Sequence, residues 1–360
     1  MNFLIIAFVH AFVILPLMKK PVLSLALIFA LQLTALPQQT AYKNLVLEGG
    51  GIRGFAYVGA FETLDSLGIL QHIERVGGTS AGAIQATLLA IGYTPGEMIK
   101  LAANIPLKEF NDGFFPGGFA RLKRRFGFFK GEKLTGWIEQ LIAYKTGDAN
   151  ITFLQLHELR SVKNYKDLYI TGTDLTDRCL RIFSYETYPH MRIKDALRIS
   201  FSIPLYFEPV VINDSGKVQK NKGDSNAHLM VDGGLLANYP IEMFDQNWYI
   251  TTDSGMNNRS ARNKATLGLL LDKPEQLEYS YKQHRNYPLP VHSLSDYAMA
   301  VYQTIIDKPN PDDTTLQRTI TISHLNLSGR VRKLSPGTIQ KLVESGRQGV
   351  RMFFKSYRQA

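Results

Sequence analysis

The sequence predicts an α/β fold with a mainly parallel central sheet and helices on both of its faces. Short apolar segments at 45–47, 73–76 and 168–171 have the length of buried strands, and stretches with apolar residues at helical spacing lie between them. Alternating strands and helices favour a parallel sheet, because each crossover helix packs back onto it. With 360 residues, 45% hydrophobic and 20% charged, the chain can bury a full core.

The expected elements follow one another in a regular order. Leu45-Val46-Leu47 is a short apolar strand, residues 48–54 form a glycine-rich loop, and 55–67 has apolar residues at helical spacing. The strand at 73–76 leads to a small-residue helix at 81–91. Further helices are expected at 95–105, 132–144, 153–159, 194–201 and 336–354, the last across the sheet, and further strands at 168–171, 181–185, 210–212, 229–231, 248–251, 267–271 and 319–323.

The first 41 residues differ in composition from the rest and are expected to lie outside the folded domain. Two apolar runs, 2–17 and 21–36, flank Met18-Lys19-Lys20, and neither reaches the roughly 20 residues of a comfortable transmembrane helix. The second run has the proportions of a signal peptide, in which case Met18 is the true translation start. We therefore expect export to the periplasm or medium, with an uncleaved membrane anchor as the alternative.

Charge and cysteine content narrow the possible functions. A net charge of +10 favours anionic partners such as phospholipid headgroups or nucleic acid. Cys179 is the only cysteine, which excludes an intrachain disulfide and a cysteine-based zinc site. The sequence also shows no clustered carboxylate or histidine pattern typical of calcium or zinc sites, so we expect no metal.

Gly78-Thr79-Ser80-Ala81-Gly82 is the first functional motif. It follows an apolar strand and opens a helix, which is the setting of a nucleophile elbow. Such a turn exposes the Ser80 hydroxyl at the end of the sheet, and the helix N-terminus favours negative charge beside it. Gly78 and Gly82 permit close approach of backbone and substrate. Unrelated chains can carry this pattern by chance, so Ser80 needs support from other motifs.

A glycine-rich loop between the first strand and the first helix is the second motif. Its backbone N–H groups converge on a point where an anionic oxygen is stabilised. The loop also matches the Gly-x-Gly-x-x-Gly pattern of dinucleotide sites, but the second strand ends without the acidic residue that would bind a ribose. We therefore predict an oxyanion hole, and its residues are Gly49, Gly50, Gly51, Arg53 and Gly54.

Asp232 ends an apolar strand and is followed by Gly233 and Gly234, so its carboxylate can face a cleft. A serine hydroxyl is a poor nucleophile until a base takes its proton. No histidine lies in a convincing triad pattern, and His228 is the strongest candidate for a base among the histidines. A partly desolvated carboxylate can serve directly, because burial raises its pKa towards the working range. Ser80 and Asp232 are therefore predicted to form a catalytic dyad.

Three motifs thus occur in a characteristic order along the chain. They are Leu-Glu-Gly-Gly-Gly-Ile-Arg-Gly at 47–54, Gly-Thr-Ser-Ala-Gly at 78–82 and Val-Asp-Gly-Gly at 231–234, with smaller matching blocks at 173–176, 202–210 and 233–240. Their order resembles that of the patatin-like phospholipases. The resemblance covers roughly 43–272, which we expect to be the motif core of a catalytic domain over 42–360, with 273–360 as its C-terminal extension.

The resemblance implies a lipid acyl hydrolase, of the phospholipase A or lysophospholipase type, that works through a Ser–Asp dyad without histidine. It implies Ser80 as nucleophile, Asp232 as base and the 49–54 loop as oxyanion hole, in a three-layer α/β/α sandwich without a cofactor. Glu48 stands where many members of the family carry aspartate. Two alternatives remain: acyl transfer by the same dyad, and a membrane lipid-binding protein without catalytic activity.

An aromatic and basic segment at 114–130 is expected to contact a membrane, since it has no acidic residue. Cations meet lipid phosphates and phenylalanine rings enter the acyl boundary. Nucleic acid would attract the same cations, but we expect a lipid surface and no nucleic acid. The segment is predicted to be an interfacial lid, and its candidate membrane-contact residues are Phe119, Arg121, Lys123, Arg124, Arg125, Phe128, Phe129 and Lys130.

Overall fold

A computed structural model describes most of the chain after residue 41. The described residues are 42–113, 117–219, 226–249, 262–272, 291–292, 297, 300–302, 304–305 and 313–357. Tyr42–Ala360 form one compact unit. The expected leader at 1–41 and residues 114–116 of the aromatic segment lie outside the described residues, so the predictions made for them are untested. No helix in the described ranges is long and apolar enough to cross a bilayer.

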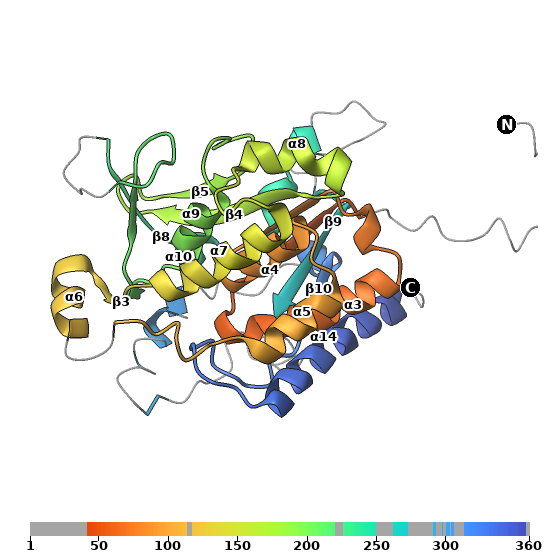
Figure 1. The fold of residues 1–360 in the computed structure, drawn as a ribbon. Helices are drawn as coiled ribbons and strands as arrows, with labels where there is room; N and C mark the ends of the chain where they lie inside the picture. Colours follow the sequence, from red (N-terminus) through yellow and green to blue (C-terminus); the bar gives the residue numbers. More distant parts are fainter. Residues whose placement is uncertain are drawn as a thin grey trace, which may run out of the picture. The chain divides into compact units, whose positions relative to one another are not determined.

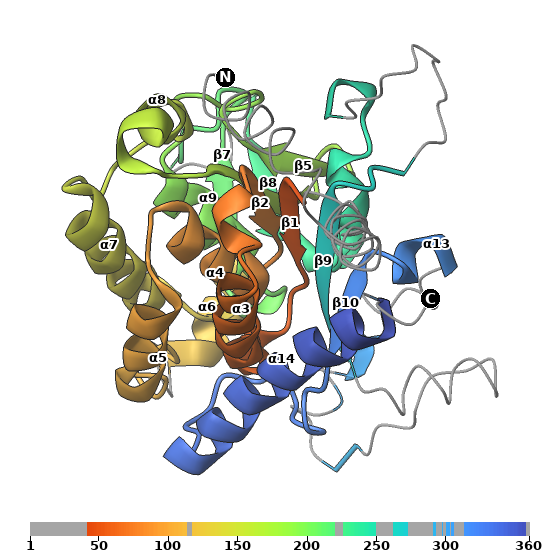
Figure 2. The same cartoon turned by 90° about the vertical axis from the view of Figure 1, so that its right-hand side faces the viewer.

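A mixed β-sheet forms the centre of this unit (Figure 1, Figure 2). Five neighbouring strands are parallel, whereas the β4–β5, β4–β8 and β7–β8 pairs are antiparallel. The sheet order is β10-β9-β1-β2-β4-β8-β7, with β5 also paired to β4. The strands are β1 (Asn44–Leu47), β2 (Arg75–Gly78), β4 (Asp167–Asp174), β5 (Cys179–Phe183), β7 (Val210–Ile212), β8 (His228–Asp232), β9 (Thr266–Leu271) and β10 (Thr319–Ile322).

Helices surround the sheet, which confirms the predicted α/β class. The α-helices are α3 (Ala56–Ser66), α4 (Ala81–Ala90), α5 (Pro95–Asn104), α6 (Gly117–Arg125), α7 (Glu132–Thr146), α8 (Phe153–Lys163), α9 (Ile193–Ser200), α10 (Gly234–Ala237), α13 (Asp313–Leu316) and α14 (Pro336–Tyr357). Short 3-10 helices are η2 (Gly51–Phe55), η3 (Leu70–His72), η4 (Ile241–Phe244) and η5 (Asn247–Tyr249). A separate parallel pair joins β3 (Gly127–Phe129) to β6 (Leu205–Phe207).

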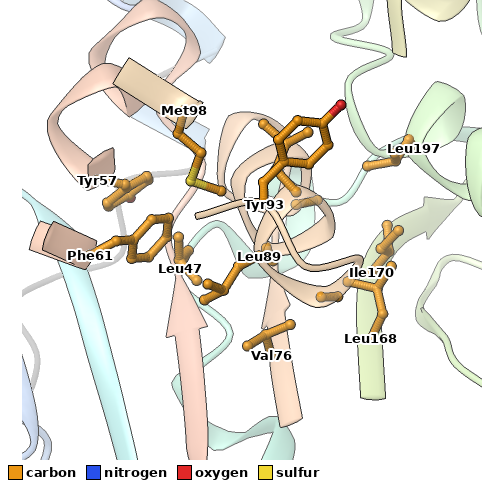
Figure 3. Packing of buried hydrophobic residues seen from close by; sticks show 14 of the residues in the cluster. Leu47, Tyr57, Phe61, Val76, Leu89, Tyr93, Met98, Leu168, Ile170 and Leu197 are labelled. Carbon is orange, nitrogen blue, oxygen red and sulfur yellow. The ribbon is translucent and has the colours of Figure 1, made fainter. Parts of the chain in front are cut away.

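The central strands bury side chains on both faces of the sheet. In β1, Leu45 and Leu47 join the large core under α3, α4 and α5, whereas Val46 joins a smaller cluster with Phe244 of η4. Figure 3 shows Leu47 and its neighbours on the helix-covered face. This division follows from the period of two in a strand, which points successive side chains to opposite faces.

The expected strand at 248–251 is wrong where the structure describes it, because Asn247–Tyr249 form the 3-10 helix η5. The Tyr249 ring packs edge-on against Tyr169 and Phe244, and its hydroxyl donates to Glu186. An aromatic side chain that anchors a turn carries the same local signal as one in a strand, and tertiary packing decides between them.

Helices α3 and α14 approach each other closely at two glycines. A Cβ atom on Gly59 would overlap the Val343 carbonyl oxygen, and one on Gly346 would overlap the Ala56 carbonyl oxygen. Neither glycine has a positive φ, so both are required by the backbone contact and not by conformation. The C-terminal helix therefore packs on α3 through backbone as well as side chains.

We expect Gly346→Ala to lower the free energy of unfolding by about 1–3 kcal/mol, because the added methyl group must push the two helices apart. Gly136→Ala is the matched control: it lies in α7, no atom lies within 4 Å of its Cβ position, and better helix propensity should add about 0.5–1 kcal/mol. Urea unfolding of both variants measures the difference, and equal effects would contradict the close-contact explanation.

Candidate active site

The two predicted catalytic residues meet along a single edge of β4. On that edge β2 pairs with the first half of β4, with Gly78 opposite Ile170, and β8 pairs with the second half, with Asp232 opposite Gly172. The other edge of β4 is taken by β5, which pairs with residues from Ile170 to Asp174. Strands β2 and β8 therefore lie end to end on one edge, and their facing ends bring Asp232 to the turn that carries Ser80.

Thr171 of β4 contacts both of these strand ends and holds them together. The Thr79 hydroxyl donates to the Ala237 carbonyl oxygen (2.8 Å) and lies 2.6 Å from the Thr171 hydroxyl, which therefore donates to it. Gly233 follows β8 at the same point, and a Cβ atom there would overlap the Thr171 side chain. Small and hydroxyl side chains are required here because two strand ends and a turn converge.

Ser80 occupies a strained turn between β2 and α4. Its φ of 52° and ψ of −121° lie in a region that L-residues rarely adopt. Cβ atoms on Gly78 and Gly82 would lie 2.7 and 2.6 Å from the Leu47 carbonyl oxygen, so only glycine allows β1 to approach the turn. The Ser80 N–H donates to the Ser200 hydroxyl at 2.9 Å. This is the strand–turn–helix setting of a nucleophile elbow.

Asp232 is completely buried beside this turn. Its Oδ1 accepts from the Gly234 N–H at 2.7 Å, while Oδ2 has no hydrogen-bond partner among the described residues. Burial raises the pKa of the carboxyl group to about 7, because the charged form loses its hydration. The Gly234 N–H and the nearby hydroxyls of Ser80 and Tyr302 lower the pKa, but by less than burial raises it.

The glycine-rich loop is held against Ser80 by Asn238. The Gly49 N–H donates to the Asn238 carbonyl oxygen (3.0 Å), and the Asn238 amide donates to Glu48 Oε1 (3.0 Å) and to the Gly49 carbonyl oxygen (3.3 Å). Glu48 Oε2 also accepts from the Leu271 N–H at 2.7 Å. The glutamate that departs from the family pattern thus joins β1, β9 and the segment after β8.

The predicted oxyanion-hole residues differ in which N–H groups are available. The Arg53 N–H and side-chain Nε both donate to the Gly50 carbonyl oxygen, at 3.2 and 3.0 Å, and Gly49 is engaged by Asn238. The N–H groups of Gly50 and Gly51 have no acceptor within the described part of the chain. Gly54 lies within η2 and lines the pocket described below. Gly50 and Gly51 are therefore the donors available to a ligand.

An apolar pocket opens beside Ser80. Its walls come from η2, α4, α5, α7 and the segments after α5 and α9, and they include Ile84, Met98, Leu107, Leu134, Trp137 and Phe207. Ser80 and Gln85 provide polar side-chain groups on these walls. Pockets of this composition hold hydrocarbon ligands by burial, whereas a few polar groups fix their orientation.

His228, the alternative base, lies at the opposite end of β8 from Asp232. Its Nδ1 is 2.9 Å from Asp174 Oδ2, and its Nε2 is 2.9 Å from Asp214 Oδ1. The hydrogen bond that His228 donates to Asp214 and the charge of Asp174 raise the pKa of His228, because they stabilise its protonated form. Its two ring nitrogens thus face these carboxylates, which leaves Asp232 as the candidate base at Ser80.

The surroundings of His228 also contain a cluster that the sequence analysis missed. Asp174, Asp177 and His228 bring potential ligand atoms within 4.8 Å of one another. Arg181 donates to Asp174 Oδ2 at 3.1 Å and also pairs with Asp177. The cluster is an ion-pair network of mixed sign, and its members come from the end of β4, the turn after it, β5 and the start of β8.

Four residues at the site carried no signal of their own in the sequence analysis. Ser200 accepts the Ser80 N–H, and Thr171 joins the two strand ends. Tyr302 lies near Asp232, and the Gly329 carbonyl oxygen accepts from Ile52 at 3.3 Å beneath the glycine loop. Asn238, by contrast, lies in the 233–240 block that carried the family resemblance, although its role required the structure.

The structure divides the predicted membrane-contact residues into two groups. Phe128 and Phe129 of β3 pack against Phe119 and Tyr206. Arg121 donates to the Phe128 and Gly113 carbonyl oxygens, and Lys130 pairs with Glu132 at 3.4 Å. Side chains that remain exposed are those of Phe119, Lys123, Arg124 and Arg125.

Comparison with known proteins establishes the family. A strand-end serine on a tight turn, a buried carboxyl group beside it and a glycine loop define a hydrolase-like site, and the model of the Patatin-like phospholipase family matches residues 45–245. Because this match spans more than half of the sequence, the chain belongs to the patatin-like phospholipase family.

Individual relatives agree with this assignment. The chain is 35% identical over 231 residues to an uncharacterized protein of Acanthamoeba polyphaga mimivirus, covering 64% of this chain and 70% of that protein. It is 33% identical over 204 residues to a probable lipid hydrolase of Invertebrate iridescent virus 6, covering 56% of this chain and 63% of that protein.

A solved structure shares the fold. In the heterodimeric ExoU–SpcU complex from the type III secretion system of Pseudomonas aeruginosa, the matching chain aligns with a TM-score of 0.52 at 21% identity. The alignment covers 89% of this chain and 52% of that one, so this chain spans about half the length of its structural neighbour. At this identity the likeness shows the fold alone.

The raised pKa of Asp232 predicts how stability depends on pH. The folded-state pKa of about 7 exceeds the ordinary value of 3.8, so between these values the folded protein holds a proton that the unfolded chain has released, and stability falls as pH rises. Asp232→Asn cannot ionise. Between pH 4 and pH 7 the free energy of unfolding of this variant should therefore rise relative to that of the parent, by at most about 4 kcal/mol.

Glu97→Gln is the control, and its effect on stability should depend on pH in the opposite direction. A hydrogen bond from Lys145 lowers the pKa of Glu97, so its carboxylate stabilises the fold above its unfolded pKa and this contribution is lost as pH falls. This variant should be less stable than the parent at pH 7 and approach it in acid. Thermal unfolding across pH 4–8 measures both, and a pH-independent difference for Asp232→Asn would contradict the buried-charge explanation.

Proposed function

We propose that this chain is a lipid acyl hydrolase of the phospholipase A or lysophospholipase type, with Ser80 as nucleophile and Asp232 as general base. The observation that carries the proposal is the buried Asp232 carboxyl group at the Ser80 turn, with an unpartnered Oδ2 among the described residues and a pKa raised to about 7. A base with a pKa near neutrality is about half ionised at neutral pH and still accepts a proton readily.

The first step forms an acyl-enzyme. Ser80 Oγ bonds to the ester carbonyl carbon while its proton moves to Asp232 Oδ2. The carbonyl oxygen becomes an oxyanion, which the N–H groups of Gly50 and Gly51 stabilise by hydrogen bonds. When the intermediate collapses, the bond to the alcohol breaks, and the alcohol leaves with the proton from Asp232. The acyl group stays esterified to Ser80.

Water completes the cycle. Asp232 takes a proton from a water molecule as the water oxygen bonds to the acyl carbon, and the same N–H groups stabilise the second oxyanion. Collapse breaks the bond to Ser80 Oγ, which recovers the proton from Asp232, and the fatty acid is released. These steps balance without a metal or cofactor.

The apolar pocket beside Ser80 supports a fatty-acyl substrate. Its walls include aliphatic side chains of α4 and α5, which offer an acyl chain burial but no hydrogen-bonded recognition of a polar group. We propose that the acyl chain lies in this pocket and that the alcohol portion, carrying the headgroup, points towards its opening.

Acyl transfer is the second candidate, and the burial of Ser80 favours it. Ser80 is 8% exposed at the end of an apolar pocket, which limits access of water. A lysolipid or alcohol that enters in place of water would accept the acyl group by the same chemistry. Product analysis with and without added lysolipid distinguishes the two: a new diacyl lipid at the expense of fatty acid would favour transfer.

Removing either member of the dyad should abolish catalysis. We expect Ser80→Ala and Asp232→Asn to lower fatty-acid release from mixed phospholipid vesicles by at least about 10³-fold, measured with the full-length chain. Ser345→Ala and Asp195→Asn are the controls: Ser345 is a buried serine of α14, and Asp195 is another carboxyl group whose pKa is raised by burial. Both should retain parental activity.

Release by the parent that survives Ser80→Ala would overturn the dyad. No release by the parent, with vesicle binding intact, would favour the lipid-binding alternative.

The pKa of Asp232 also predicts a pH–rate profile. Because only the ionised carboxylate can accept the Ser80 proton, kcat/KM should rise about tenfold per pH unit below pH 7 and level off above it. The measurement is the initial rate on a soluble short-chain ester from pH 5 to pH 9. A profile that stays flat across this range would exclude Asp232 as the titrating base.

A further inference from the structure

Two exposed apolar residues, Phe126 and Leu205, lie side by side in strained conformations. Their φ angles are 65° and 66°, and their side chains are 47% and 64% exposed. Phe126 directly precedes Gly127, which pairs with Leu205 in the β3–β6 ladder. A left-handed conformation is unfavourable for a bulky residue. Because both residues remain exposed, burial of their side chains offsets little of this cost. Such strain is characteristic of functional surfaces.

Helix α6 lies beside β3 (Figure 1), and its basic last turn directly precedes Phe126. Lys123, Arg124 and Arg125 form its last turn and are exposed, and Phe119 is 60% exposed. The helix is fixed to β3, because the Phe128 ring packs so closely on Gly118 that a Cβ atom there would lie 2.7 Å from it, and the Phe119 ring also packs on Phe128. The helix is thus anchored with its cations directed to solvent.

A second basic segment, Arg330 to Lys333, lies near the same corner. Val331 lines the pocket together with Ile203, and its carbonyl oxygen accepts from Asn111 at 3.3 Å. Asn111 in turn accepts from the hydroxyl of Tyr206, the neighbour of Leu205, at 2.7 Å. Arg330, Arg332 and Lys333 are exposed. Two basic segments far apart in the sequence therefore lie near residues that line the same pocket.

The charge of this corner is complementary to an anionic lipid surface. Glu208 contacts Arg121 and Arg125 at 3.7 and 3.5 Å and is itself only 15% exposed. Each exposed cation adds to the attraction between this corner and an anionic bilayer. Exposed apolar side chains can also insert into the acyl boundary of a bilayer, and a nucleic acid offers no such apolar environment.

We propose that this docking surface (Phe119, Lys123, Arg124, Arg125, Phe126, Leu205, Arg330, Arg332 and Lys333) binds anionic phospholipid bilayers, with Phe126 and Leu205 as the inserting side chains. The proposal rests on the proposed function and extends it by naming the surface. Ile203 lies two residues before Leu205 and lines the pocket. An acyl chain can therefore pass from the bilayer into the pocket without crossing bulk water.

Site-specific fluorescence tests insertion independently of catalysis and of any binding by residues 1–41. Phe126→Trp, Leu205→Trp and Val162→Trp are made in full-length Ser80→Ala, where Val162 is an apolar residue of α8 that is more exposed (76%) than either of the other two. Vesicles contain phosphatidylglycerol and brominated phosphatidylcholine, which quenches tryptophan in the acyl region. We expect quenching at 126 and 205 beyond that of Ser80→Ala alone, and none at 162. Equal quenching at all three positions would overturn the proposal.

The cations are tested in the same assay. Arg332→Ser with Lys333→Ser, added to the Phe126→Trp protein, should weaken binding to phosphatidylglycerol vesicles about tenfold or more and reduce its dependence on salt. Lys163→Ser on α8 is the matched control and should have no effect. If the Arg332 and Lys333 changes leave vesicle binding intact but abolish binding to duplex DNA, the surface is a nucleic-acid site and the proposal is wrong.

Hydrolysis by variants at the strained positions separates docking from chemistry. Asparagine tolerates a positive φ better than phenylalanine or leucine, so the chain with Phe126→Asn and Leu205→Asn should fold. It should hydrolyse a soluble short-chain ester like the parent but release at least about tenfold less fatty acid from vesicles. An unchanged rate on vesicles would contradict docking. A parent inactive on the soluble ester would instead refute the proposed function and leave the quenching test valid.

Discussion

The site depends on one edge of β4 being shared by two strands that end against each other. Strand β2 leaves that edge at Gly78, and β8 fills the remainder up to Asp232. A shift of β8 by one residue would turn the Asp232 side chain to the other face of the sheet. The contacts of Thr171 with Thr79, and its close packing on Gly233, hold the two ends in register. A packing constraint thus positions the candidate base against the candidate nucleophile.

Two energetic costs coincide at this junction. Ser80 adopts an unfavourable φ, and Asp232 is buried so completely that its pKa rises to about 7. Neither cost is required by the fold, because glycine at position 80 or an uncharged residue at position 232 would relieve it. Such costs persist where the surrounding structure over-determines a geometry, and they accumulate where chemistry requires it. The large core under α3, α4 and α5 offsets them.

Local patterns predicted most of the strands and helices and the order of the three motifs, because hydrophobic periodicity and glycine loops can be recognised in short segments of the sequence. They did not predict that β8 would run antiparallel along the β4 edge, since strand pairing is a long-range property. For the same reason Ser200 and Gly329 were missed: the Ser200 hydroxyl and the Gly329 carbonyl oxygen are acceptors that only the fold brings near the site. The strand expected at 248–251 was wrong because aromatic packing, which has no period, determines the turn around Tyr249.

Helix α9 connects the docking surface to the nucleophile turn. Arg198 of α9 donates to the carbonyl oxygens of Lys130 and Glu208, at 2.6 and 2.8 Å, and so ties together the ends of β3 and β6. Burial lowers the pKa of Arg198 to about 10, which still leaves it charged at neutral pH. Two residues further along α9, Ser200 accepts the Ser80 N–H. Because one short helix bonds to both, a bilayer bound at β3 and β6 would meet the pocket at a fixed angle, and the orientation of the protein would determine which ester reaches Ser80.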